Sequence, residues 1–167
     1  MRWLLRALGF LTVGCGGASG AIATLSGAVT ATESVVVTAG LNSHLIETTP
    51  MWAFAMGPAS VEGYPPFSVN IFLPGNAPMA GIFTTSNTLD AETSLDAGQW
   101  TQSFASTGGT AVGTFELLVT ATGAPSPPDG TGWPYDWRDL HGTLKATLVP
   151  TPAINTQTGD VTLDVRF

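Results

Sequence analysis

Apolar and polar residues alternate most clearly in three stretches of the sequence. Residues 111–122, 140–149 and 160–167 place apolar or small side chains at every second position, with Thr, Glu, Lys, Asp or Arg between them. A period of two is typical of a β-strand that buries one face and exposes the other to water. We therefore predict three half-buried antiparallel strands in this part of the chain.

Further runs are apolar or β-branched and are bounded by Gly, Pro, Asn or Asp. They cover residues 21–32, 34–39, 51–56, 68–73, 81–85 and 99–105. No stretch shows the 3.6-residue period of an amphipathic helix. Eight or nine short strands with turn residues between them predict an all-β fold, an antiparallel β-sandwich, with a small β-barrel as the alternative.

Composition supports one folded domain over residues 21–167. The chain has 167 residues, of which 44% are hydrophobic and only 10% are charged. Disordered segments combine low hydrophobicity with high charge, so this composition argues against disorder. Thr and Val also favour strands, because β-branched side chains fit a pleated surface.

The first residues have the features of an export signal. Two arginines lie within residues 1–6, and the apolar run 7–13 is far shorter than the roughly 20 residues that a membrane-spanning helix needs. The run ends in the segment 11–15, Leu-Thr-Val-Gly-Cys, which resembles the bacterial lipobox. The resemblance implies that residues 1–14 are a lipoprotein signal peptide and that Cys15 is diacylated and becomes the new N-terminus.

Chemistry is consistent with this role for Cys15. It is the only cysteine of the chain, so it has no partner for an internal disulfide. Residues 15–20 would be the lipidated cysteine and a flexible Gly/Ser tether. Gly16 after the cysteine implies, in a Gram-negative host, delivery to the outer membrane. The alternatives are an ordinary cleavage site at 18–20, Ala-Ser-Gly, which would release a soluble secreted protein, and an incidental cysteine.

The charge balance excludes some classes of partner. Of the five basic residues, Arg2 and Arg6 lie in the signal, which leaves Arg138, Lys145 and Arg166 against twelve acids. Nucleic-acid binding draws on several basic contacts to phosphate, so we exclude that class. The body also lacks the basic residues that would hold it on an anionic membrane by charge. Any attachment to a membrane would be through lipid.

Two strands share a local pattern. The segments 112–117 and 141–146 both contain Gly-Thr followed by an apolar and a charged residue. They resemble the closing strands of uncharacterised β-rich bacterial lipoproteins. This resemblance covers a small part of the chain and implies no activity.

The connection 123–139 is the segment with the most candidate chemistry, because long connections without their own secondary structure are usually functional or disordered. The residues that we single out in it are Trp133, Tyr135, Trp137, Asp136 and Asp139. Aromatic rings beside carboxylates can stack on a sugar and bond its hydroxyls. The same rings can instead fold down as a lid on the open end of the domain, and we favour the lid.

Metal and catalytic signals are weak. The acids at 90, 92 and 96 and those of 123–139 do not match a calcium loop, so we expect no cofactor, with Ca²⁺ as the one cation to consider. No nucleophile motif, phosphate loop or dinucleotide fingerprint is present. We expect a non-enzymatic cell-envelope lipoprotein with a structural or partner-binding role, its partner a glycan or an envelope protein. A carbohydrate-binding or adhesion module is the alternative, and a hydrolase with dispersed carboxylates a distant one.

Overall fold

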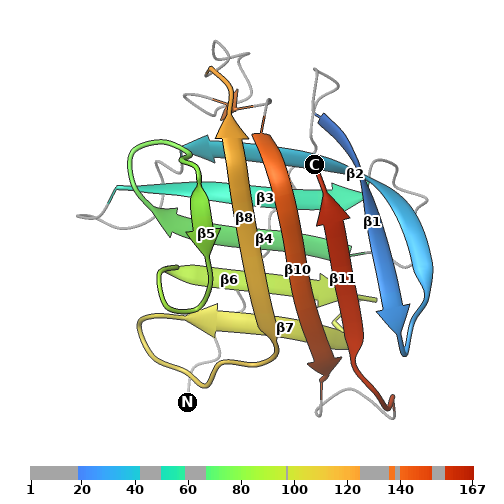
Figure 1. Ribbon diagram of the computed structural model, residues 1–167. Coiled ribbons are helices and arrows are strands. Elements are labelled where there is room, and N and C mark those ends of the chain that lie inside the picture. The colour runs from blue at the N-terminus through green and yellow to red at the C-terminus, as the bar shows by residue number, and fades with distance from the viewer. Residues whose placement is uncertain are drawn as a thin grey trace.

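The computed structural model describes residues 19–41, 50–58, 67–96, 98–124, 136–137, 140–151 and 157–167. All regular secondary structure in these ranges is strand, which confirms the all-β prediction (Figure 1). The strands are β1 (Ser19–Gly27), β2 (Ala31–Leu41), β3 (Met51–Pro58), β4 (Phe67–Pro74), β5 (Gly81–Phe83), β6 (Asp90–Leu95), β7 (Trp100–Ala105), β8 (Thr114–Thr122), β9 (Asp136–Trp137), β10 (Leu140–Pro150) and β11 (Val161–Arg166). None of the described residues belongs to a helix long and apolar enough to cross a membrane.

The sheet closes on itself, so the predicted sandwich is wrong and the small barrel is right. Neighbouring strands are hydrogen-bonded in the order β1, β2, β3, β4, β6, β7, β10, β11 and back to β1, an antiparallel barrel of 8 strands. Alternation within a strand is the same in a sandwich and in a barrel, because both bury one face of each strand. Only the pairing between distant strands distinguishes the two folds.

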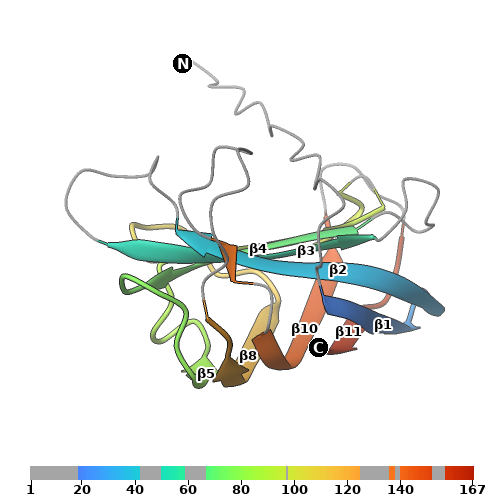
Figure 2. The ribbon, with the colours of Figure 1, turned by 90° about the horizontal axis from the view of Figure 1, so that it is seen from above.

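The barrel is flattened into two layers that cross. β8, β10, β11 and β1 form a front layer, and β2, β3, β4, β6 and β7 run behind it nearly at right angles (Figure 1). Seen from above, the two layers lie face to face (Figure 2). β5 and β8 extend the front layer beside β10, outside the closed path. Orthogonal packing of this kind leaves one continuous interior between the layers.

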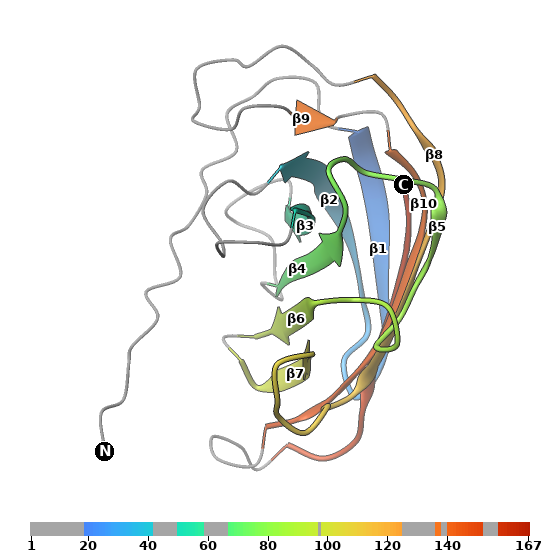
Figure 3. The same cartoon turned by 90° about the vertical axis from the view of Figure 1, so that its left-hand side faces the viewer.

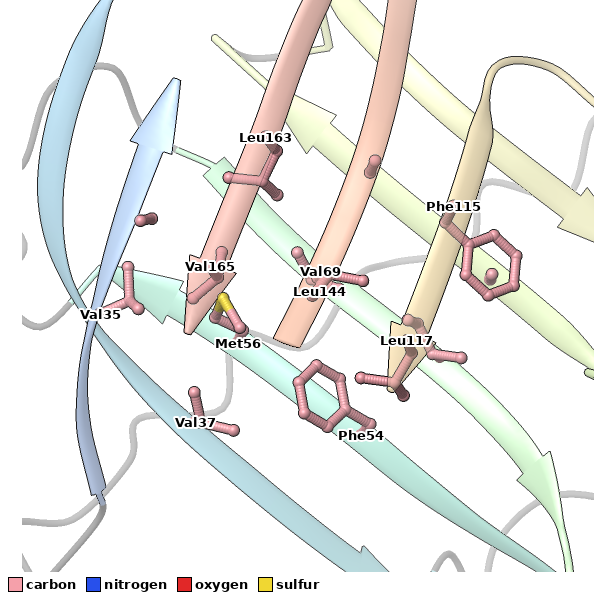
Figure 4. Packing of buried hydrophobic residues seen from close by; sticks show 14 of the residues in the cluster. Val35, Val37, Phe54, Met56, Val69, Phe115, Leu117, Leu144, Leu163 and Val165 are labelled. Carbon is pink, nitrogen blue, oxygen red and sulfur yellow. The ribbon is translucent and has the colours of Figure 1, made fainter. Parts of the chain in front are cut away.

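Apolar side chains from both layers fill that interior. Phe54 of β3 and Leu144 of β10 are fully buried and project into the space between the layers (Figure 4). Burying one such side chain contributes roughly 1.5–3 kcal/mol of stability. On β10, burial alternates along nearly the whole strand, so that every second residue faces the core, as the sequence pattern predicts.

A short joint between β7 and β10 completes the barrel. Val149 pairs with Thr101, and Pro150 pairs with Trp100. The backbone N–H of Thr151 donates to the carbonyl of Gln99 at 2.9 Å. These few contacts decide between an open and a closed sheet, and no local pattern in the sequence indicates them.

Two strands were missed by the sequence pattern, and one hairpin was misplaced. β6 carries acids on its outer face and only Ala91, Thr93 and Leu95 inside, so its apolar signal is weak. β9 has two residues and forms only through its pairing with β2. The run 21–32 spans the turn between β1 and β2, which Gly27 makes possible with a φ of 103°, a value that favours glycine.

Candidate functional site

The sequence features of interest converge on one end of the front layer, which we call the upper end. There β1 begins, β8 ends and β10 begins (Figures 1 and 3). Thr122 pairs with Leu140, so the connection 123–139 leaves and re-enters the sheet at adjacent positions. Ser19 pairs with Val37, so the chain that precedes β1 also enters the barrel at this end.

β9 fastens the connection 123–139 to the barrel. Asp136 pairs with Gly40, and Trp137 pairs with Ala39. Since β3 occupies the other edge of β2 at these positions, β9 takes the edge that β1 uses up to Val37. Figure 3 shows β9 beside the upper end of β1. The connection is therefore tied to the barrel a few residues from the point where the N-terminal segment enters it.

A close backbone contact makes the upper end compact. The strand register of β10 shifts between His141 and Gly142, and Gly142 exchanges two backbone hydrogen bonds with Phe167, at 2.8 and 3.1 Å. A Cβ at Gly142 would collide with the carbonyl oxygen of Leu118, so this position requires glycine. The Phe167 ring packs on Phe54, with ring centroids 5.2 Å apart. These contacts hold β8, β10 and the residue after β11 together beneath the connection.

Most of the residues singled out in the sequence lie outside the described residues. These are Cys15, Trp133, Tyr135 and Asp139. For Asp136 and Trp137 the structure places the backbone, in β9, and not the side chains. The choice between a lid and a sugar platform therefore stays a prediction, although both would be built at the upper end.

A row of five residues, three of them apolar, crosses the outer surface of the front layer. Ile82 lies opposite Leu118, Leu118 opposite Thr143, Thr143 opposite Arg166, and Arg166 opposite Ile22. We call Ile82, Leu118 and Ile22 the apolar row. Both isoleucines occupy outward-facing positions of their strands. Ile82 is 57% exposed and Ile22 is 53% exposed. The sequence analysis missed the row, because its members come together only through the register of five strands.

Met79 is a further exposed apolar residue beside this row. It is 52% exposed and lies just before β5, which pairs with the upper half of β8 through Gly81 and Val119. Among the described residues, Ile22, Met79 and Ile82 are the large hydrophobic side chains with substantial exposure. All three therefore lie on the outer surface of the front layer or beside it, at or above the level of the apolar row.

Charged side chains occupy the other half of the front layer. Glu116, Lys145 and Asp164 form the next row, two residues further from the upper end on each strand. The Lys145 ammonium lies 3.9 Å from the Asp164 carboxylate. On the described parts of β1, β8 and β10 above the apolar row there is no Asp or Glu. On these strands the acids therefore lie below the apolar row, whereas Asp136 of β9 lies at the upper end itself.

The interior offers little reactive chemistry. The buried polar residues among the described ones are Thr88, Thr93 and Gln102, none of which titrates near neutral pH. Thr93 Oγ1 donates to Gln102 Oε1 at 3.3 Å, while Gln102 Nε2 has no partner. Within the described ranges, no three His, Cys, Asp or Glu side chains gather where they could hold a metal ion.

Comparison of the chain with known protein families, with curated proteins and with solved structures found no match. The functional argument therefore depends on the residues and on the arrangement of the barrel. Its strongest elements are the N-terminal sequence, the place where that sequence enters the barrel, and the exposed apolar residues of the front layer.

Proposed function

We propose that this chain is a lipid-anchored protein of the bacterial cell envelope, held in the membrane by diacylated Cys15. Its β-barrel has a non-enzymatic role, structural or partner-binding, at the envelope surface. By the resemblance of the N-terminal segment to lipoprotein signals, residues 1–14 are removed on export. In a Gram-negative host, Gly16 after the cysteine favours the outer membrane.

The observation that carries this proposal is the position of β1. The strand begins at Ser19, four residues after Cys15, so the folded barrel starts where a short Gly/Ala tether would end. Cleavage after Gly20 by an ordinary signal peptidase would remove Ser19 and Gly20, which pair with Val37 and Val36. Cleavage before Cys15 leaves β1 whole, which favours the lipoprotein route over release of a soluble protein.

The interior supports a binding or structural role for the barrel. An eight-stranded barrel is about wide enough for side chains to fill, and here the described apolar side chains of both layers form one cluster. The polar groups buried among them are two threonines and one glutamine. A partner would accordingly be met by the outer surface or by the connections between strands.

The test replaces the thiol that would carry the lipid. The full chain and its Cys15→Ser variant are expressed in a bacterial host with labelled palmitate, and membrane and soluble fractions are compared. We expect label and membrane partition for the parent protein and loss of both for Cys15→Ser. The control is the double variant Cys15→Ser/Ser19→Cys, which keeps one thiol outside the lipobox and should stay unlabelled. Unchanged membrane partition of Cys15→Ser would overturn the proposal.

A further inference from the structure

We infer that the upper end of the barrel faces and touches the lipid leaflet in which Cys15 is anchored. The inference rests on the proposed anchor and adds an orientation and a contact surface to it. The surface consists of the apolar row, Ile22, Leu118 and Ile82, together with Met79, which lies two residues before β5. Its ligand is the interfacial region of the bilayer.

Chain length limits how far the upper end can lie from the membrane. Ser19 lies four positions after Cys15, and an extended chain spans at most about 3.3–3.6 Å per residue, so the gap is at most about 14 Å. Ser19 enters the barrel at the upper end, beside β9. β1 itself extends eight residues further, to Gly27, and so places its far end roughly 26 Å away. The tether therefore keeps the upper end at the membrane surface.

The side chains at the upper end fit such a contact. Ile22, Met79 and Ile82 are each more than half exposed, and Ile82 lies beside Leu118, while Thr143 and Arg166 separate Leu118 from Ile22 in the row. Burying them in the headgroup region would contribute about 25 cal/mol for each Å² of apolar surface removed from water. Arg166, between Thr143 and Ile22 in the same row, can reach lipid phosphate with its long side chain.

The charges on the front layer disfavour the opposite orientation and a side-on one. Glu116 and Asp164 lie on the half of the front layer away from the upper end, and Asp160 lies beyond them, just before β11. A barrel lying on its front layer would bring these three carboxylates to the headgroups, where anionic lipid repels them. With the upper end toward the leaflet these three stay in water, and Asp136 of β9 is the described acid nearest to the membrane.

The experiment measures the depth of the two ends of one strand. Thr122→Cys and Thr114→Cys place single reactive thiols at the upper and lower ends of β8, since lipid blocks Cys15 in the mature protein. Each lipidated protein is labelled with a thiol-reactive fluorophore and reconstituted in phosphatidylcholine vesicles with and without spin-labelled lipid. We expect the label at position 122 to be quenched several-fold more than the label at position 114.

A pair of charge variants tests the apolar row itself. Ile82→Asp should reduce the quenching at position 122 several-fold, because a carboxylate then sits in the contact, whereas Ser26→Asp at the lower end should leave it unchanged. Both positions are exposed, so the fold is retained, which circular dichroism checks. Vesicle-bound protein with equal quenching at positions 122 and 114 would overturn the orientation, and no effect of Ile82→Asp would overturn the contact through the apolar row. Protein that fails to float with the vesicles would overturn the anchor instead.

Discussion

Substitutions at the buried Gln102 and its partner test how an unpaired polar group in the core affects the free energy of unfolding. Its side chain is fully buried on β7, and Thr93 on β6 is its described side-chain partner, at 3.3 Å. Among the described residues, the Nε2 amide group has no hydrogen-bond partner. We propose to measure Thr93→Val, Gln102→Met and the double variant against the parent protein.

The expected free energies follow from which groups each variant leaves unpaired. Thr93→Val removes the one donor to Gln102 Oε1 and should lower the free energy of unfolding by about 1–3 kcal/mol, the cost of one more orphaned buried group. Gln102→Met removes the unpaired amide but orphans the Thr93 hydroxyl, so the two effects should cancel to within about 1 kcal/mol. The double variant removes the polar groups of both side chains and leaves neither partner of this pair unpaired, so we expect it to be about 1–3 kcal/mol more stable than the parent.

Urea unfolding followed by tryptophan fluorescence measures all four proteins, with Trp100 of β7 close to the site in the sheet. Equal m-values across the set would show that the variants change stability and not the extent of unfolding. A double variant less stable than the parent by more than about 1 kcal/mol would refute the reasoning, because the amide would then be satisfied in the folded protein.

Two further predictions concern the front layer. Gly142→Ala should destabilise the protein by about 1–3 kcal/mol, because the new methyl group meets the Leu118 carbonyl and the Phe167 ring. Gly20→Ala has open space and should be neutral or slightly stabilising; equal effects of the two substitutions on the urea midpoint would contradict the close contact at Gly142. Asp164→Asn should change the free energy of unfolding by less than about 1 kcal/mol, since Asp164 and Lys145 are 55% and 64% exposed. A larger loss that persists at high salt would show that the pair is coupled more strongly than its exposure suggests.

Most strands could be predicted from the sequence, because the alternation of apolar and polar residues is a local property. β10 and β11 follow the predicted pattern residue by residue, since each side chain reports on the face that it occupies. β6 was not predicted, because Asp90 and Glu92 lie on either side of the small residue Ala91 and acids near turns resemble loop sequence. Closure of the barrel depends on the pairing of Val149 and Pro150 with β7, to which no periodicity points.

The apolar row could not be predicted from the sequence for a related reason. Ile22, Leu118 and Ile82 occupy outward positions on three different strands, and a single exposed apolar residue is ordinary. Their alignment follows from the register of β5, β8, β10, β11 and β1 together. The sequence did indicate the connection 123–139, and its attachment through β9 next to the start of β1 became visible only in the fold.

The central claim is that the mature protein begins at a lipid-bearing Cys15, and mass spectrometry of the native N-terminal peptide tests it most directly. The protein would be extracted from membranes of a bacterial host, digested and analysed for its first peptide. The account predicts a peptide that starts at Cys15 and carries the added mass of a diacylglyceryl group. A peptide that starts at Ala21, or an unmodified Cys15 within an intact N-terminus, would contradict it.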